Sequence, residues 1–170
     1  MVELSLAVFV ACMAWAAIND LRTMRIPNAC VLALLAAFVC VVPFAPFGWA
    51  EVGDHVVAML GTLVFCFCLF MFNKLGAGDG KLLAVVALWV GPSGLFPFAV
   101  YTALFGGGLA FIVLMMRSSL LPVRMATHPI VERLQGEDRS IPYAMAIAPA
   151  ALLALTDSPW AASLPFLGAS

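Results

Sequence analysis

Six apolar runs separated by short polar segments dominate the sequence. They cover about residues 2–18, 29–47, 56–73, 81–91, 95–116 and 141–156. A helix needs about 20 mostly apolar residues to cross the ~30 Å hydrocarbon core of a bilayer. The pattern therefore predicts an all-α polytopic membrane bundle of about six transmembrane helices.

The fourth run is the exception because it is short. Pro92-Ser93-Gly94 has the composition of a turn, which leaves only about 11 residues before it, roughly half the length that a span needs. Either this helix begins earlier, inside the preceding glycine-rich loop, or Asp79 lies below the membrane surface.

The composition also indicates that the chain lies in a lipid bilayer. Hydrophobic residues make up 65% of the 170 residues and the mean hydropathy is +1.11, whereas soluble domains are about 45–50% apolar. No domain boundary is apparent, so we expect one integral-membrane domain over 1–170, with 2–18 as a retained first span.

The net charge of −1 gives no reason to expect nucleic acid as a partner. The five cysteines form no C-x-x-C pair, so neither a metal site nor a disulfide framework is predicted.

All basic residues fall on one side of the predicted bundle. The eight Lys and Arg residues lie after the first, third and fifth runs, as Arg22, Arg25, Lys74, Lys81, Arg117, Arg124, Arg133 and Arg139. Positively charged loops stay in the cytoplasm. The segments at about 19–28, 74–81 and 117–140 are therefore expected to be cytoplasmic, and both termini non-cytoplasmic. Trp49, Trp89 and Trp160 are expected in an aromatic belt near the outer boundary.

Asp20 and Asp79 are the candidate reactive groups. Each is expected at the cytoplasmic face, and carboxylates beside lipid are functional candidates because charge there is costly. Two neighbouring carboxylates share one proton and titrate as a pair, which suits hydrolysis of a peptide bond by an acid and a base without a cofactor. If the two aspartates are not reactive, Asp79 could be a helix N-cap and Asp20 a polar residue at the membrane interface that ends a helix.

Other polar or small residues are predicted to shape this site. Gly76 and Gly78 permit positive φ and close backbone approach, so an extended substrate could pair with their loop. Asn28 is a plausible N-cap for the second helix, and Pro27 restricts the residue before it to an extended conformation. Lys81 either favours the ionised form of Asp79 or, as we prefer, sits at the lipid interface.

Three segments carry a family resemblance. Asp20–Asn28 resembles the first conserved segment of type IV prepilin peptidases, and Gly76–Leu82 resembles their GxGD loop. Ile141–Ile147, which contains Tyr143, is similar to a third segment at the start of the last helix, although Ala144 stands where the family usually has glycine. The resemblance covers most of the chain.

The resemblance implies a bacterial inner-membrane aspartic protease that cuts the basic leader from prepilins at the cytoplasmic face. By carry-over, Asp20 and Asp79 would be the catalytic pair, with no cofactor or metal. Larger relatives have a cysteine-containing cytoplasmic region linked to N-methylation. Because no such region is seen, the chain looks like the minimal form that serves tight-adherence (Flp) pili and does not methylate. The oligomeric state stays open.

Two other classes compete with this interpretation. A presenilin-like intramembrane protease shares GxGD, but its first aspartate usually lies within a span beside a tyrosine, whereas here Asn19 precedes Asp20 and Arg22 follows. A small transporter or assembly scaffold would use the carboxylates to bind a cation or proton. Such sites tend to lie at the midplane between inverted repeats, and no repeat is visible here.

Overall fold

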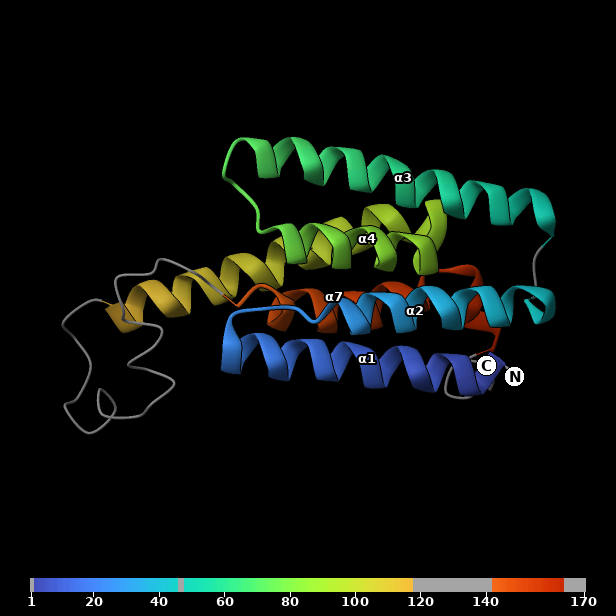
Figure 1. Ribbon diagram of the computed structural model, residues 1–170, viewed down its shortest axis with the longest axis horizontal. Coiled ribbons are helices and arrows are strands. Elements are labelled where there is room, and N and C mark those ends of the chain that lie inside the picture. Colours follow the sequence, from blue (N-terminus) through green and yellow to red (C-terminus); the bar gives the residue numbers. More distant parts are fainter. Residues whose placement is uncertain (1, 46–47, 118–141, 164–170) are drawn as a thin grey trace.

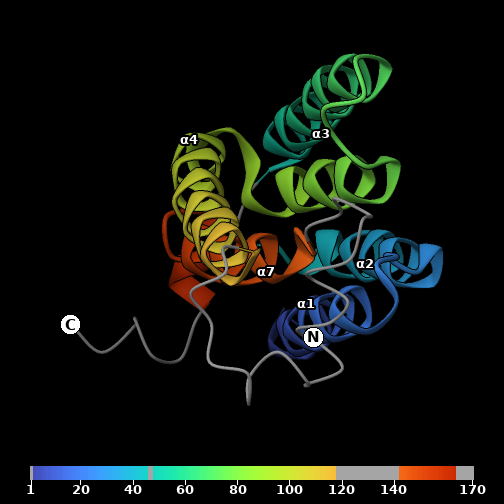
Figure 2. The same cartoon turned by 90° about the vertical axis from the view of Figure 1, so that its left-hand side faces the viewer.

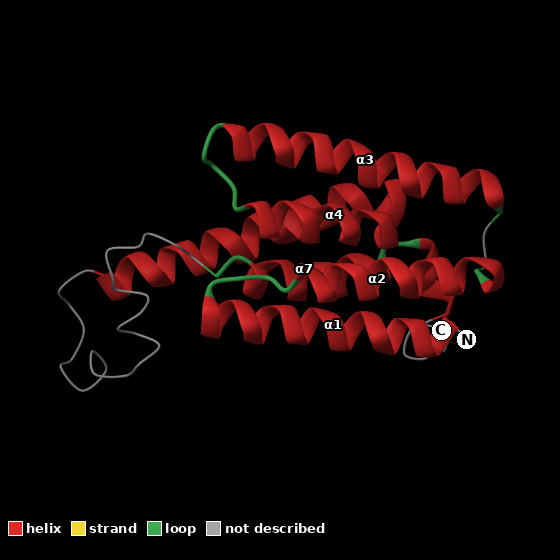
Figure 3. Cartoon of the chain, in the orientation of Figure 1, coloured by secondary structure: helices red, strands yellow, loops and turns green. Residues whose placement is uncertain are grey.

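The computed structural model describes residues 2–45, 48–117 and 142–163, and every regular element within these ranges is a helix (Figure 3). In chain order the elements are α1 (Val2–Thr23), α2 (Asn28–Val41), the 3-10 helix η1 (Val42–Phe44), α3 (Trp49–Met71), α4 (Ala77–Arg117), α7 (Ala144–Thr156) and the 3-10 helix η2 (Pro159–Ser163). The predicted 117–140 loop lies outside the described residues apart from Arg117.

Three of these helices are long and apolar enough to cross a membrane. They are Val2–Thr23, Trp49–Met71 and Ala77–Met115, and two shorter apolar helices cover Asn28–Phe44 and Ala144–Thr156. A soluble chain would have to hide such surfaces, so the all-helical structure fits the predicted membrane bundle.

Helix α4 is two helices joined at a sharp break. Gly91 has φ 66° and ψ −174°, and it separates 77–90 from the segment that begins at Pro92. Figure 1 shows the second, yellow half running back along the first. The predicted turn after the fourth run is thus present. The helix before it begins early, at Ala77, which is the first of the two possibilities for the short run.

Only glycine fits at this break. The backbone at Gly91 lies in a region of φ and ψ that side chains strongly disfavour. In addition, a Cβ atom built there would lie 2.5 Å from Cε1 of His55. Conformation and space therefore both require the absence of a side chain at position 91.

The break also leaves backbone carbonyls without their helical donors. Pro92 has no N–H for the carbonyl of Leu88. The Nδ1–H of His55 donates to that oxygen at 2.7 Å, which fixes the tautomer of the ring because a carbonyl only accepts. Nε1–H of Trp160 likewise donates to the carbonyl of Trp89 at 2.7 Å. Side chains from α3 and η2 thereby replace the missing helical bonds.

The predicted aromatic belt is wrong for two of its members. Trp89 and Trp160 are fully buried, with ring centroids 5.7 Å apart. Phe9 and Phe38 pack against Trp89 with centroids at 5.0 and 5.6 Å. The indoles are needed inside the bundle because each N–H donates to a backbone carbonyl, that of Trp89 to Leu34 at 3.2 Å.

The first half of α4 forms the centre of the bundle. Its apolar residues are buried on every side, as at Leu82, Ala84, Val85, Val86, Ala87, Leu88, Trp89 and Val90. Its Trp89 donates to α2 and its Leu88 accepts from α3, and Figure 2 shows this half lying between those two helices. A helix that is apolar all round is stable only in such a position. Its first turn, which contains Asp79, is therefore held at one end of the bundle.

That end is shared by the α1–α2 linker, the α3–α4 linker and the start of α7 (Figure 1). The linkers are shorter than predicted. The 19–28 segment is helical through Thr23, and the 74–81 segment is helical from Ala77. Both aspartates consequently lie in terminal helical turns rather than in loops.

Candidate active site

Asp20 lies in the last turn of α1 and is only 5% exposed. Its Oδ2 accepts a hydrogen bond of 3.0 Å from the backbone N–H of Ala144, in the first turn of α7. N–H groups in a first helical turn have no intrahelical acceptor, and the partial positive charge there favours an anion. Asp20 thus satisfies a buried donor of another helix.

Ala144 did not emerge from the sequence as a site residue. The available signal was its position directly after Pro142 and Tyr143, at the expected start of the last helix. Ala144 is fully buried, and it acts through its backbone rather than its methyl group. The departure from glycine at this position leaves the donor in place.

Asp79 lies in the first turn of α4 and is half-buried. Its carboxylate accepts a hydrogen bond from the backbone N–H of Gly76, the reach-back geometry of a capping box. Asp79 is the third residue of the helix, so the alternative that it is the N-cap is wrong. A Cβ at Gly76 would lie 2.7 Å from Oδ2 of Asp79, so glycine leaves room for the carboxylate.

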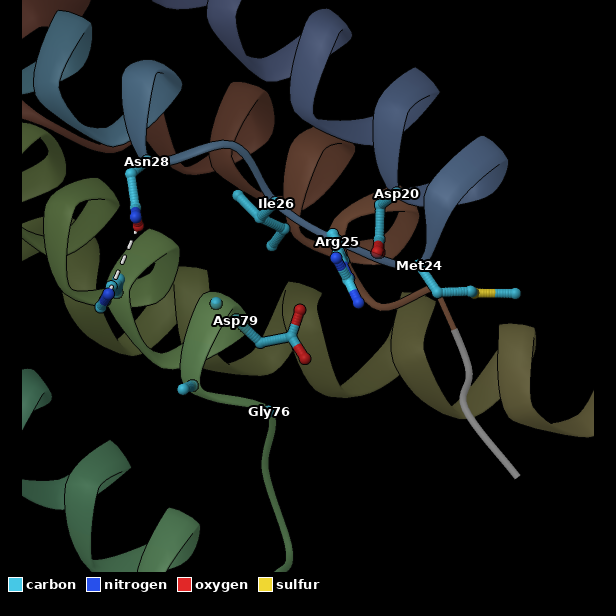
Figure 4. Close-up of a pocket in the computed structure, with 10 residues that line it drawn as sticks. Asp20, Met24, Arg25, Ile26, Asn28, Gly76 and Asp79 are labelled. Carbon is cyan, nitrogen blue, oxygen red and sulfur yellow. Dashed lines mark hydrogen bonds between the residues drawn. The ribbon is translucent and has the colours of Figure 1, made fainter. Parts of the chain in front are cut away.

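The two carboxyl groups line one cavity. Its volume is about 350 Å³, within the range of ligand pockets, and it is lined by Asp20, Met24, Arg25, Ile26, Asn28, Gly76, Ala77, Gly78, Asp79 and Lys81. Figure 4 shows Asp20 and Asp79 pointing into it from two different helices. The groups interact electrostatically.

The α1–α2 linker forms one wall of the cavity and is clamped by Asn19. Nδ2 of Asn19 donates to the carbonyl of Arg25 at 2.6 Å and to Oγ1 of Thr23 at 3.0 Å. Met24 adopts a positive φ of 53°, and its N–H still donates to the carbonyl of Asp20 at 2.8 Å. The chain therefore turns immediately beside Asp20. The sequence did not predict that Asn19 would hold this turn in place.

Gly78 lets this linker approach α4. A Cβ at Gly78 would lie 3.4 Å from Cβ of Ile26, and Pro27 continues the extended course with φ −65° and ψ 131°. Among the described glycines only Gly91 has positive φ. Gly76 and Gly78 therefore do not use the positive φ that glycine permits, whereas the close approach is present at Gly78.

Asn28 and Lys81 join α2 to α4 at the rim of the cavity. Nζ of Lys81 donates to Oδ1 of Asn28 at 3.3 Å. Asn28 is the first residue of α2, and the cap position is Pro27 without a side-chain hydrogen bond. The predicted N-cap role of Asn28 is therefore wrong, because its amide binds the lysine.

Tyr143 lines a neighbouring apolar cavity instead. That cavity is about 290 Å³ and also contains Leu75, Leu83 and Gly106. The ring lies 3.8 Å from the position of a Cβ on Gly106. Tyr143 directly precedes Ala144, the donor to Asp20, but does not line the cavity that contains the two aspartates. Within the described residues, no group of three or more His, Cys, Asp or Glu could hold a metal ion.

A bundle of apolar helices with two carboxylates on one cavity is the architecture expected of a membrane-embedded peptidase. A protein-family model shows which family of peptidases this is. The model described as the type IV leader peptidase family matches residues 7–111, more than half of the chain, and the chain therefore belongs to that family. The matched range contains both Asp20 and Asp79. Neither the curated proteins nor the solved structures gave a match. At the family level, the protein is a multi-pass membrane peptidase that acts on type IV leader peptides.

Proposed function

We propose that the protein is an aspartic endopeptidase that removes the leader of Flp-like type IV prepilins without N-methylation. The observation that carries the proposal is that Asp20 and Asp79 face one cavity from separate helices. Family membership supports the substrate class.

The mechanism uses one proton shared by the two carboxyl groups. The ionised carboxylate takes a proton from water as the water attacks the scissile carbonyl. The protonated partner hydrogen-bonds that carbonyl oxygen, and a proton is then delivered to the leaving amine. Each aspartate already accepts one backbone N–H, from Ala144 or Gly76. These bonds orient the side chains without a cofactor.

The reaction takes place at the cytoplasmic face of the bacterial inner membrane. The linkers that flank both aspartates carry Arg25 and Lys74, which the positive-inside rule places in the cytoplasm. Six spans with both termini outside would accommodate this arrangement. Asp20 lies in the final turn of α1, which favours cleavage at the membrane boundary over the mid-span cleavage of presenilin-like proteases.

Co-expression with a prepilin tests the proposal. The wild-type chain should shorten the precursor, and Asp20→Asn or Asp79→Asn should each leave it intact. Asp54→Asn is the matched control because Asp54 is an exposed carboxylate on α3, and it should cleave normally. Full cleavage by Asp20→Asn or Asp79→Asn would refute the proposed pair. A methylated product terminus would contradict the minimal form.

A further inference from the structure

An uncharged groove runs along the side of the bundle between α3 and the second half of α4. It consists of two adjoining cavities of about 660 and 290 Å³, which share Leu83, Thr102 and Ala103. Gly61 and Phe65 of α3 form one wall, and both are exposed. Figure 2 shows the backbones of α3 and of the yellow half of α4 lying apart from each other. We call this feature the lateral groove.

The lateral groove ends beside the candidate active site. Its last residues include Leu75 and Tyr143. Leu75 directly precedes Gly76, the donor to Asp79, and Tyr143 directly precedes Ala144, the donor to Asp20. A ligand lying in the groove would therefore have one end next to both carboxylates.

The walls have the features of a helix-packing surface in a membrane. Small residues, Gly61, Ala103, Gly106 and Gly107, allow a helix backbone to approach closely. Thr102 lines both cavities. Its hydroxyl oxygen is buried and has no hydrogen-bond partner among the residues that the structure describes. A buried hydroxyl without a partner is costly, and polar groups of this kind form hydrogen bonds between membrane helices.

We infer that the lateral groove binds the apolar helix that follows the cleavage site of the substrate. This inference rests on the proposed function, because a prepilin carries its cleavage site at the start of such a helix. The uncharged lining matches an apolar helix, and the position of Leu75 and Tyr143 places the start of that helix at the aspartates. Residues of the basic leader then lie beyond the groove, at the cytoplasmic end.

Glycine substitutions provide a direct test. Gly61 and Gly107 line the groove, and a Cβ at either would meet nothing within 4 Å, so a leucine there starts from open space and takes up room in the groove. Gly53 and Gly108 are matched controls on the same two helices, since both are equally open and line neither cavity. We expect Gly61→Leu and Gly107→Leu to slow precursor cleavage by about tenfold or more. Gly53→Leu and Gly108→Leu should cleave at the wild-type rate.

Photocross-linking gives a second readout that does not depend on activity. A photoreactive phenylalanine at Phe65 lies in the groove, whereas one at Phe67 faces a different cavity on the other flank of α3. In an Asp79→Asn background, which should hold the precursor uncut, the probe at position 65 should label the substrate helix and the probe at position 67 should not.

The results of these experiments test the groove inference and the proposed function separately. If wild type cleaves and Gly61→Leu and Gly107→Leu cleave equally well, the groove holds only lipid chains and the inference is wrong, while the proposed function survives. Labelling from position 67 instead of 65 would likewise overturn it. A wild-type chain that leaves every precursor uncut would refute the proposed function itself.

Discussion

The backbone N–H of Ala144 donates a 3.0 Å hydrogen bond to Oδ2 of Asp20, although the two residues are 124 positions apart in the chain. The contact joins the end of α1 to the start of α7 and orients a buried carboxylate toward the cavity that it shares with Asp79. It gives Asp20 a structural role beside the catalytic role that we propose, and these two roles can be separated by mutation.

Asp20→Asn keeps an oxygen acceptor for Ala144, whereas Asp20→Ala removes it. A buried N–H left without a partner costs about 1–3 kcal/mol. We expect both variants to be inactive, but only Asp20→Ala to unfold at a clearly lower temperature in detergent. Equal stability of the two variants would show that the hydrogen bond does not contribute.

Gly76→Ala should impair catalysis while leaving the fold intact. Its Cβ would approach Oδ2 of Asp79 to 2.7 Å, so the carboxylate must move. Displacing a reacting group by about 1 Å costs on the order of 100-fold in rate. Cleavage of the precursor in vesicles measures the effect, with Gly53→Ala as the control because its Cβ meets nothing within 4 Å. Normal activity of Gly76→Ala would contradict the packing of the glycine against Asp79.

Gly91→Ala should destabilise the protein without touching the aspartates. The substitution forces an alanine into a disfavoured conformation, at about 1–3 kcal/mol, and presses its methyl group against His55. Thermal unfolding should therefore begin at a lower temperature than in wild type. Gly108→Ala, in an open helical position, should be neutral or slightly stabilising. Unchanged stability of Gly91→Ala would mean that the break in α4 is absent or relocates freely.

Cleavage should depend on pH with a bell-shaped profile. When both carboxyl groups are protonated no base remains, and activity falls toward low pH. When both are ionised no acid remains, and activity falls toward high pH. The two limbs belong to the pair, so they report shared rather than individual titrations. A rate that rises to a plateau and stays there at alkaline pH would argue against an obligatory acid.

Much of this arrangement follows from hydrophobic patterning and charge. The apolar runs predicted helices where the structure has them, and the basic loops predicted that the linkers after α1 and α3 share one end. Pro92 predicted the turn after the fourth run. These features could be predicted because they depend on short stretches of sequence and on the cost of exposing polar groups to lipid.

The remaining features depend on tertiary contacts. Hydropathy does not distinguish a lipid-facing tryptophan from a buried one, so Trp89 and Trp160 were misplaced. The partners of the carbonyls freed at Gly91 come from distant elements, as His55 shows. Asn28 has the composition of a cap, yet Lys81 from another helix engages its amide. The role of Ala144 rests on a backbone group that every residue except proline has.

If Asp20 and Asp79 form one catalytic unit, their effects on precursor cleavage depend on each other, and a double-mutant cycle measures that dependence. Rates are measured for wild type, Asp20→Asn, Asp79→Asn and the double variant in the same vesicles. Because residues that act as a unit are strongly non-additive, each single variant should fall to the background rate and the double variant should be no slower. A single variant that retains a substantial rate, with a further multiplicative loss in the double variant, would contradict the claim.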